Sequence, residues 1–210
     1  MTSDIKIRTL VGPGIKTYIQ SMVKVREQVL GEIPYLQLAA AESDLNYLKH
    51  VIMSKDSIAV IVFDGSKIIG CAIGMPLSEE LPGFQEPFIK LGLPTQEYFY
   101  FGFSALLKPY RSRGLGHHFF DLREEHVRHL KRFTKTCFTS SVPPKGFASS
   151  AEQTSLETFW QKRGYIQHPE MTCRLPILDH HFVISLKFWI KELQPVQNTQ
   201  VEQLDSFLYD

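Results

Sequence analysis

Residues 111–116 read Arg-Ser-Arg-Gly-Leu-Gly and join two stretches of different character. Residues 98–107 form an apolar, aromatic run typical of a buried strand, and residues 117–131 have the apolar spacing of a helix. The first N–H groups of a helix lack intrahelical partners, and the helix dipole makes that end positive. Glycines let the backbone approach an anion closely, and two arginines add charged donors. The stretch therefore predicts a loop for a phosphorylated ligand, set between a strand and a helix.

Two common phosphate loops do not fit this stretch. The nucleoside-triphosphatase loop ends in Gly-Lys-Ser or Gly-Lys-Thr, and neither tripeptide occurs in the chain. The dinucleotide fingerprint needs three glycines soon after the first strand of a βαβ unit, whereas this stretch has two and lies mid-chain. A surface turn whose glycines only bend the backbone stays open as the alternative to a phosphate site.

Two motifs carry a resemblance to a known family. Arg111-x-x-Gly114-x-Gly116 resembles the pyrophosphate loop of the GNAT N-acetyltransferases, whose pattern is Gln/Arg-x-x-Gly-x-Gly/Ala. Further along, Phe159-Trp160-x-x-x-Gly164-Tyr165 resembles the second signature of that family, an aromatic residue, three residues and then Gly-aromatic. The resemblance spans residues 5–193 as an order of elements, while matches of single residues are confined to the two motifs and their flanks.

The resemblance implies an α+β fold, the GNAT acyl-CoA N-acyltransferase fold, with a central mixed, mostly antiparallel sheet flanked by helices. The patterns of the chain agree with it. They predict strands at 5–10, 57–63, 68–75, 97–107, 133–142, 165–175 and 182–190, and helices at 15–31, 39–53, 117–131 and 149–163. We expect residues 1–193 to form the GNAT domain and residues 194–210 a polar tail, either a short helix or a frayed end.

Residues 78–96 stand apart from these patterns. They carry three prolines and two glycines, which predicts a loop rather than one continuous element. Phe84 and Phe88 make the segment too apolar for a plain linker. It is either a packed structural loop or a functional one, and we test the hypothesis that it is a lid that orders when an acceptor binds. With residues 32–38, it would shape the acceptor pocket.

The resemblance also implies an activity. GNAT enzymes transfer an acetyl group directly from acetyl-CoA, as co-substrate and without a metal, to the primary amine of a small molecule or peptide. By position, the resemblance implies that Ser104, Ala105 and Leu106 contact the acetyl and pantetheine parts of acetyl-CoA. It implies that the pyrophosphate is held by Arg111, Ser112, Arg113, Gly114, Leu115, Gly116 and the N–H of His117. It also implies that Phe159 and Trp160 pack near the pantetheine arm.

The catalytic positions depart from the family pattern. Trp160 stands where many members have a Tyr that protonates the leaving thiolate, and an indole N–H is a very poor acid. Tyr100 stands where some members place a Glu base, and Glu97 lies on the opposite face of that strand unless a bulge intervenes. The candidates for proton transfer are therefore Glu97, Tyr98 and Tyr100, with ordinary strand packing as the alternative for each.

Other readings of the motifs stay open or are excluded. Loss of the Tyr favours a non-catalytic acetyl-CoA sensor or interaction module with the same fold, and a longer acyl donor is a further alternative. His117 and Asp121 resemble the His-x-x-x-Asp motif of an unrelated acyltransferase class, but Gly116 replaces the first His of its full form. Four glutamates hint at a cationic acceptor, although such residues are usually solvated: Glu79, Glu80, Glu86 and Glu97.

Composition limits the partners and the location. A net charge of +1 gives no reason to expect nucleic acid or an anionic membrane as a partner. The three cysteines are too few and too widely spaced for a disulfide framework or a zinc site, so we expect buried thiols and a cytoplasmic protein. The first residues lack the apolar core of a signal peptide. The adjacent pair His180 and His181 predicts a turn rather than a metal site. A homodimer stays open.

Overall fold

The computed structural model describes residues 4–33, 41–143, 151–177 and 182–194. Its strands form one sheet in the order β1-β2-β3-β4-β6-β8-β7, and β5 pairs with β3 off this path. The strands are β1 (Ile5–Val11), β2 (Ile58–Asp64), β3 (Lys67–Pro76), β4 (Tyr98–Phe101), β5 (Ser104–Leu106), β6 (Lys135–Val142), β7 (Ile166–Ile177) and β8 (Phe182–Glu192). Only the β4–β6 pair of this sheet is parallel.

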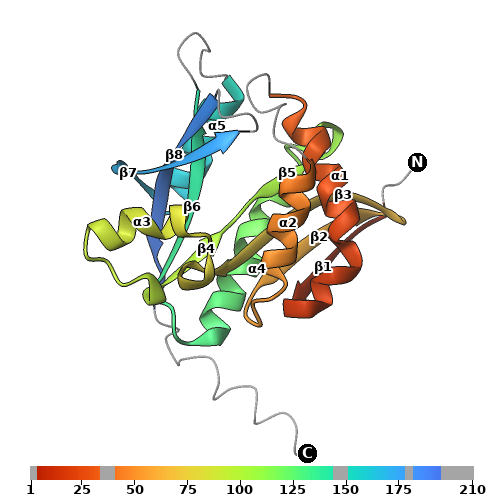
Figure 1. The fold of residues 1–210 in the computed structure, drawn as a ribbon. Coiled ribbons are helices and arrows are strands. Elements are labelled where there is room, and N and C mark those ends of the chain that lie inside the picture. The colour runs from red at the N-terminus through yellow and green to blue at the C-terminus, as the bar shows by residue number, and fades with distance from the viewer. Residues whose placement is uncertain (1–3, 34–40, 144–150, 178–181, 195–210) are drawn as a thin grey trace, which may run out of the picture.

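Helices cover both faces of this sheet (Figure 1). Helices α1 (Ile19–Leu30) and α2 (Ala41–Val51) pack on one face of the β1–β3 half, and α4 (Leu115–Leu130) packs on the other. Helix α5 (Ala151–Lys162) lies on the α4 side of β6 and β8, while α3 (Pro82–Lys90) packs against β7 from the opposite side. This arrangement confirms the predicted α+β class with a mixed, mostly antiparallel sheet.

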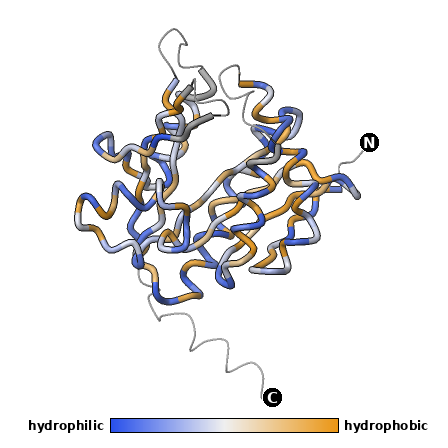
Figure 2. Tube along the Cα trace, in the orientation of Figure 1, coloured by the Kyte–Doolittle hydropathy of each residue, from blue (hydrophilic) through white to orange (hydrophobic). Residues whose placement is uncertain are grey.

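The core follows from the long apolar strands. Residues Ile58 to Val62 of β2 are all buried, as expected for a strand covered on both faces, and Figure 2 shows this hydrophobic stretch in the middle of the β1–β3 half. The three cysteines are free and buried, as predicted. Burial raises the pKa of the Cys71 thiol to about 12, so the protonated, unreactive form prevails there.

The segment 78–96 corrects the prediction of a loop, because it contains the helix α3. Pro82 occupies the first turn, where its missing N–H has no intrahelical partner to lose. Pro87 lies inside the helix, and its ring is buried against the body of the protein. Phe84 and Phe88 share one face at i and i+4 spacing and are buried, so the segment is a packed part of the domain.

The strand expected at 97–107 is divided in two. Strand β4 pairs with β6 from Tyr98 to Phe101, after which β5 pairs with β3 alone. Phe101 and Ser104 both contact Arg123 of α4, although residues three apart on a regular strand face opposite sides. One additional residue therefore forms a β-bulge at Gly102, and the sheet splays between β5 and β6 beyond it.

Several expectations fall outside the described residues. These are the greater part of the loop 32–38, the pair His180 and His181, and the tail from residue 195. Within the ranges that the structure describes, no helix is long and apolar enough to cross a bilayer. The same ranges hold no group of three His, Cys, Asp or Glu side chains placed to share a metal ion.

Candidate functional site

The loop 111–116 has the geometry that its sequence predicts. Two left-handed residues, Ser112 at φ 60° and Gly114 at φ 80°, turn the chain directly into α4, with Gly114 as the N-cap. Left-handed backbone of this kind suits glycine. Leu115 is buried and anchors the first turn, whereas Ser112, Arg113 and Gly114 are exposed. The start of a sixteen-residue helix is thus presented to solvent with a basic side chain beside it.

The two arginines of the loop differ in role. Arg111 is half-buried: its Nε donates to the carbonyl of Leu106 at 2.9 Å, and its Nη2 lies 2.8 Å from the carboxylate of Glu32. These contacts tie the loop to the end of β5 and to the residues after α1. The exposed Arg113 packs its guanidinium over the ring of Tyr110, 5.4 Å from the ring centre. Arg113 is therefore the arginine available to an anion at the loop.

The N–H of His117 has a partner within the first turn of α4. It donates to the carbonyl of Gly114 at 2.9 Å, which closes the first turn of α4. The His117 ring is exposed and packs edge to face on Phe159, with ring centres 4.9 Å apart. The structure thus brings the two sequence motifs together through this contact.

A groove of about 790 Å³ lies between the start of α4 and α5, lined by His117, Ser155, Thr158, Phe159, Lys162, Arg163 and Lys191. Two of its three cations are compensated by acids. Arg163 bonds to Asp121 at 2.6 Å, and Lys191 bonds to Glu124 at 2.9 Å. Within the described residues no ion pair is found for Lys162, which leaves this side chain as the groove's uncompensated positive charge.

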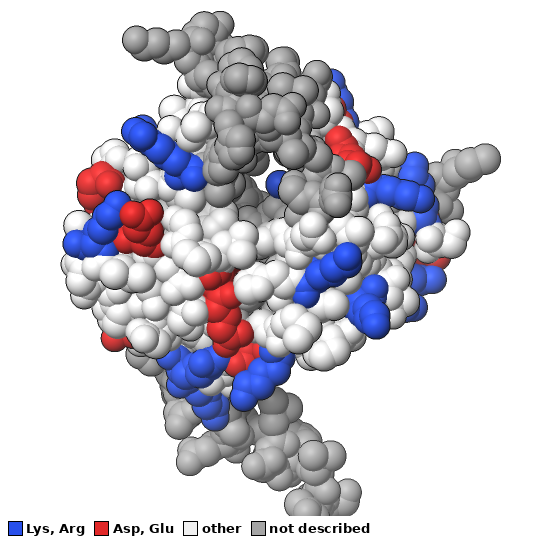
Figure 3. Space-filling view, viewed as in Figure 1, with Lys and Arg blue, Asp and Glu red and all other residues white. Residues whose placement is uncertain are grey.

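Trp160 lies in an aromatic cluster rather than at the groove. Its ring packs on Phe138 and Trp189, with centres 5.0 and 5.2 Å away. The indole N–H of Trp189 donates to Ser140 at 3.0 Å. The cluster covers the α5 face of β6 and β8, beside the splay. Figure 3 shows a hollow near the centre of the molecule, between the α3 and β6–β8 part and the β1–β3 part.

The bulge at the splay is held by a buried arginine. Arg123 donates to the carbonyl of Ile73 at 2.9 Å and to the hydroxyl of Ser104 at 3.0 Å, and its guanidinium lies 4.3 Å from the centre of the Phe101 ring. Ile73 also accepts from the N–H of Gly102. Burial lowers the pKa of Arg123 to about 9. One side chain therefore joins β3, β5 and α4 where the sheet opens.

The three cofactor positions expected on this strand lie together on β5. Ser104 is exposed, Leu106 is half-buried and Ala105 packs into the core. Because β5 pairs only with β3, its other backbone edge has no strand partner among the described residues. An unpaired edge of this kind can accept an extended ligand as an additional strand.

The catalytic candidates lie elsewhere. Tyr100 is 2% exposed, and its hydroxyl is hydrogen-bonded to Thr139 at 2.8 Å. Burial raises its pKa well above the usual range. Glu97 lies 3.3 Å from Lys135 at the start of β4, five residues and roughly 16 Å from the bulge. Tyr98 is buried between Phe88 and the ammonium of Lys135. Of the three, Tyr100 lies nearest the bulge, two residues before Gly102, while Glu97 and Tyr98 lie at the opposite end of β4.

Sequence reasoning did not identify Glu80 and Tyr47 as a pair. Glu80 is 2% exposed and accepts from the Tyr47 hydroxyl at 2.8 Å and from the N–H of Leu81 at 3.0 Å. A Cβ on Gly102 would lie 2.9 Å from that hydroxyl, so the pair lies directly against the bulge. No sequence signal joins these residues, because they come from α2, the segment after β3 and the end of β4.

Comparisons with known proteins support the fold. No family model matches the sequence, and no curated protein sequence matches it. Solved structures do match. A GNAT-family acetyltransferase from Streptococcus pneumoniae shares 16% identity with a TM-score of 0.58, over 90% of this chain and 100% of its own.

Two further matches were determined with ligands. One is YncA from Salmonella typhimurium, described as an acetyltransferase with its cofactor acetyl-CoA, at 8% identity and TM-score 0.58, over 90% of this chain and 94% of its own. The other is NAA60 from Arabidopsis thaliana in complex with a bisubstrate analogue, at 12% identity and TM-score 0.57, over 90% of this chain and 99% of its own. At these identities the likeness establishes the architecture: the chain has the fold of the GNAT acetyltransferases.

Proposed function

We propose that this protein binds acetyl-CoA and transfers its acetyl group directly to a primary amine of a small molecule or peptide. One observation carries the proposal. The unpaired edge of β5 leads from the bulge at Gly102 toward the exposed start of α4 at Gly114. An extended ligand with a thioester at one end and a pyrophosphate at the other fits these two features.

Each part of the cofactor has a counterpart in the chain. The pantetheine arm bonds along the open edge of β5 as an added strand. The pyrophosphate lies at the start of α4, near Arg113 and the N–H groups that follow Gly114. In this proposal, a backbone N–H on the open edge beyond Gly102 stabilises the negative charge that develops on the thioester oxygen.

The departure of the thiolate needs no acid from α5. Trp160 is held in its aromatic cluster, and an indole N–H does not protonate a leaving group at neutral pH. A thiolate leaves far more readily than an alkoxide, since a thiol is the stronger acid. Transfer therefore proceeds with Trp160 at the position where a tyrosine is common.

The same tryptophan favours a second candidate function, an acetyl-CoA sensor without transfer. Calorimetric titration with acetyl-CoA, followed by thiol release with a panel of amines, separates the two. Binding with thiol release supports the enzyme, and binding without release to any amine supports the sensor. Absence of binding contradicts both.

The groove cation gives a further prediction. We expect Lys162→Glu to weaken the binding of CoA about tenfold, because it reverses the uncompensated charge beside the phosphate loop. The affinity for acetyl-pantetheine, which lacks the nucleotide phosphates, should stay unchanged. Lys24→Glu on the exposed face of α1 makes the same change in net charge and should affect neither ligand. An equal loss for both ligands in Lys162→Glu would contradict the assignment of the groove.

A further inference from the structure

Glu80 is a buried acid whose environment is unusual. It lies between the end of β3 and the start of α3, and among the described residues two donors reach its carboxylate, Tyr47 on one oxygen and the Leu81 N–H on the other. In the described part of the chain no cation forms an ion pair with it. A buried carboxylate without a cation is costly for the folded state, which suggests a use other than structural support.

The position of this acid relative to the bulge is the second observation. The Tyr47 hydroxyl touches the space where Gly102 lacks a side chain. Any larger residue at that position would displace the hydroxyl or the side chain of Ile73. The Tyr47 hydroxyl therefore lies between the Glu80 carboxylate and the backbone at Gly102, where the proposed thioester meets the sheet.

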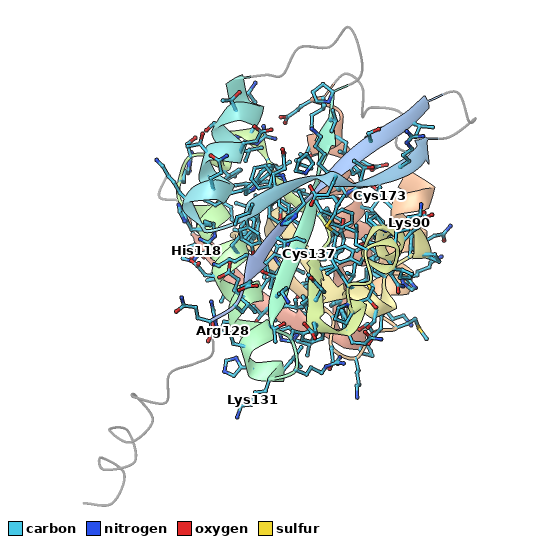
Figure 4. The ribbon with its side chains drawn as sticks, turned by 90° about the vertical axis from the view of Figure 1, so that its left-hand side faces the viewer. Lys90, His118, Arg128, Lys131, Cys137 and Cys173 are labelled. Carbon is cyan, nitrogen blue, oxygen red and sulfur yellow. The ribbon has the colours of Figure 1, made fainter. Side chains whose placement is uncertain are left out.

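The groups around Glu80 are mostly neutral or distant. From α2 come Tyr47 and His50, whose ring is bonded to the carbonyl of Glu79 at 2.8 Å. Arg26 of α1 is near Tyr47 but pairs with Asp44. The other titratable groups whose pKa values depend on Glu80 are Tyr100 of β4, Cys137 of β6 and Cys173 of β7. Figure 4 shows Cys137 and Cys173 on their strands, with α3 and its Lys90 beside them.

Burial is the largest influence on Glu80, and it raises the pKa of the carboxyl. The hydrogen bond from Tyr47 acts in the opposite direction. When it is ionised, a carboxyl with a raised pKa is a stronger base than an ordinary surface glutamate. Tyr100 is less suited to this role, because burial holds its hydroxyl protonated and Thr139 occupies it.

We infer that Glu80 is the proton acceptor for the amine in the transfer, acting through the hydroxyl of Tyr47. The inference rests on the proposed function. The ammonium gives a proton to the Tyr47 oxygen as the Tyr47 proton moves to the Glu80 carboxylate. The neutral nitrogen then attacks the thioester carbon, and the C–S bond breaks. The thiolate takes the second nitrogen proton to become CoA thiol, and the Glu80 carboxyl returns its proton to water.

The test compares Glu80→Gln with Glu79→Gln, its exposed neighbour. The amide introduced by Glu80→Gln can keep both hydrogen bonds, since its oxygen accepts from Leu81 and its NH₂ donates to Tyr47. Acetyl-CoA affinity is measured by calorimetry, and thiol release with spermidine, phenethylamine and a tetrapeptide with a free α-amine is followed against pH. We expect Glu80→Gln to keep its acetyl-CoA affinity within twofold, to lower kcat about a hundredfold and to lose the acid limb of the pH profile. Glu79→Gln should match the wild type.

The variant Tyr47→Phe provides an independent test of the inference. Removing the hydroxyl removes a donor to the charged carboxylate, so the pKa of Glu80 rises further. Because the proposed proton path runs through this hydroxyl, we expect kcat to fall about as far as in Glu80→Gln, with the acid limb of the residual activity displaced to higher pH. A purely structural role for Tyr47 would lower stability without moving this limb.

Thermal unfolding tests the raised pKa of Glu80 in the absence of an acceptor amine. A raised pKa in the folded state means that the folded chain binds more protons, so stability falls as pH rises above the ordinary Glu value. The melting temperature of the wild type should therefore decrease relative to that of Glu80→Gln as the pH rises toward neutrality.

The outcomes separate the inference from the proposed function. An active wild type with Glu80→Gln at full kcat, or with an unmoved acid limb in Tyr47→Phe, overturns the inference alone. A wild type that releases thiol with none of the three amines overturns the proposed transfer and the inference together. A Glu80→Gln variant that unfolds, with an unmoved limb in Tyr47→Phe, assigns Glu80 a structural role and overturns the inference.

Discussion

Gly114→Asp is expected to raise the dissociation constant for acetyl-CoA about a thousandfold while the protein stays folded. The change places a carboxylate at the N-cap of α4, where the proposed pyrophosphate lies. Its charge repels the phosphates, and its oxygen competes for the N–H groups of the first turn. Losing two or more charge-assisted hydrogen bonds at about 1.5–3 kcal/mol each gives an effect of this size.

Gly92→Asp is the matched control for this variant. Gly92 also adopts a left-handed conformation, at φ 67°, and a Cβ at either glycine meets no atom within 4 Å. Both variants should therefore lose about 1 kcal/mol of stability from backbone strain. Only Gly114→Asp should lose acetyl-CoA in calorimetric titration, and retained binding in that variant would show that the loop is a simple turn.

Phe88→Ala is expected to lower the free energy of unfolding by about 3–5 kcal/mol, the range for removing a large buried aromatic side chain. The ring is fully buried and packs edge to face on Tyr98 and Phe188, with centres 4.7 and 5.0 Å away. It connects α3 to β4 and β8, so its removal leaves a cavity between three elements. Urea unfolding followed by fluorescence measures the change.

Ile89→Ala, on the adjacent residue, is the control for this prediction. Ile89 is 64% exposed, and its truncation should change stability by no more than about 0.5 kcal/mol. The comparison also tests the lid hypothesis for residues 78–96. A packed α3 requires the large difference between the two variants and similar amide exchange with and without an acceptor amine. Equal small effects would instead indicate that α3 detaches readily.

The parts of the fold that local chemistry determines could be predicted from the sequence. The loop 111–116 is an example, because Gly114 is needed for a left-handed residue and α4 begins directly after it. The pairing of β2 with β3 follows similarly from two apolar runs around a turn at Gly65.

The parts that tertiary contacts determine could not be predicted. The composition of 78–96 predicts a loop, but Pro82 falls in the first turn of α3, where a helix tolerates proline, and burial of Phe84 and Phe88 stabilises this helix. The break at Gly102 is invisible in a continuous apolar run, because Arg123 and Ile73 of other elements hold it. Glu80 carries no local mark of its burial, since its partner Tyr47 lies on a separate helix.

Helix α4 fixes the distance between the loop 111–116 and the bulge at Gly102. It begins at the loop 111–116, and Arg123, eight residues after Leu115, bonds to Ile73 and Ser104 beside the bulge at Gly102. At 1.5 Å per residue the two points lie about 12 Å apart along a rigid axis. Under the proposed function, this helix sets the distance between the sites for the pyrophosphate and the thioester of the donor. A donor with a shortened pantetheine arm would be unable to reach both sites at once, however well each end binds alone. The length of the acyl group beyond the bulge is not restricted by this distance.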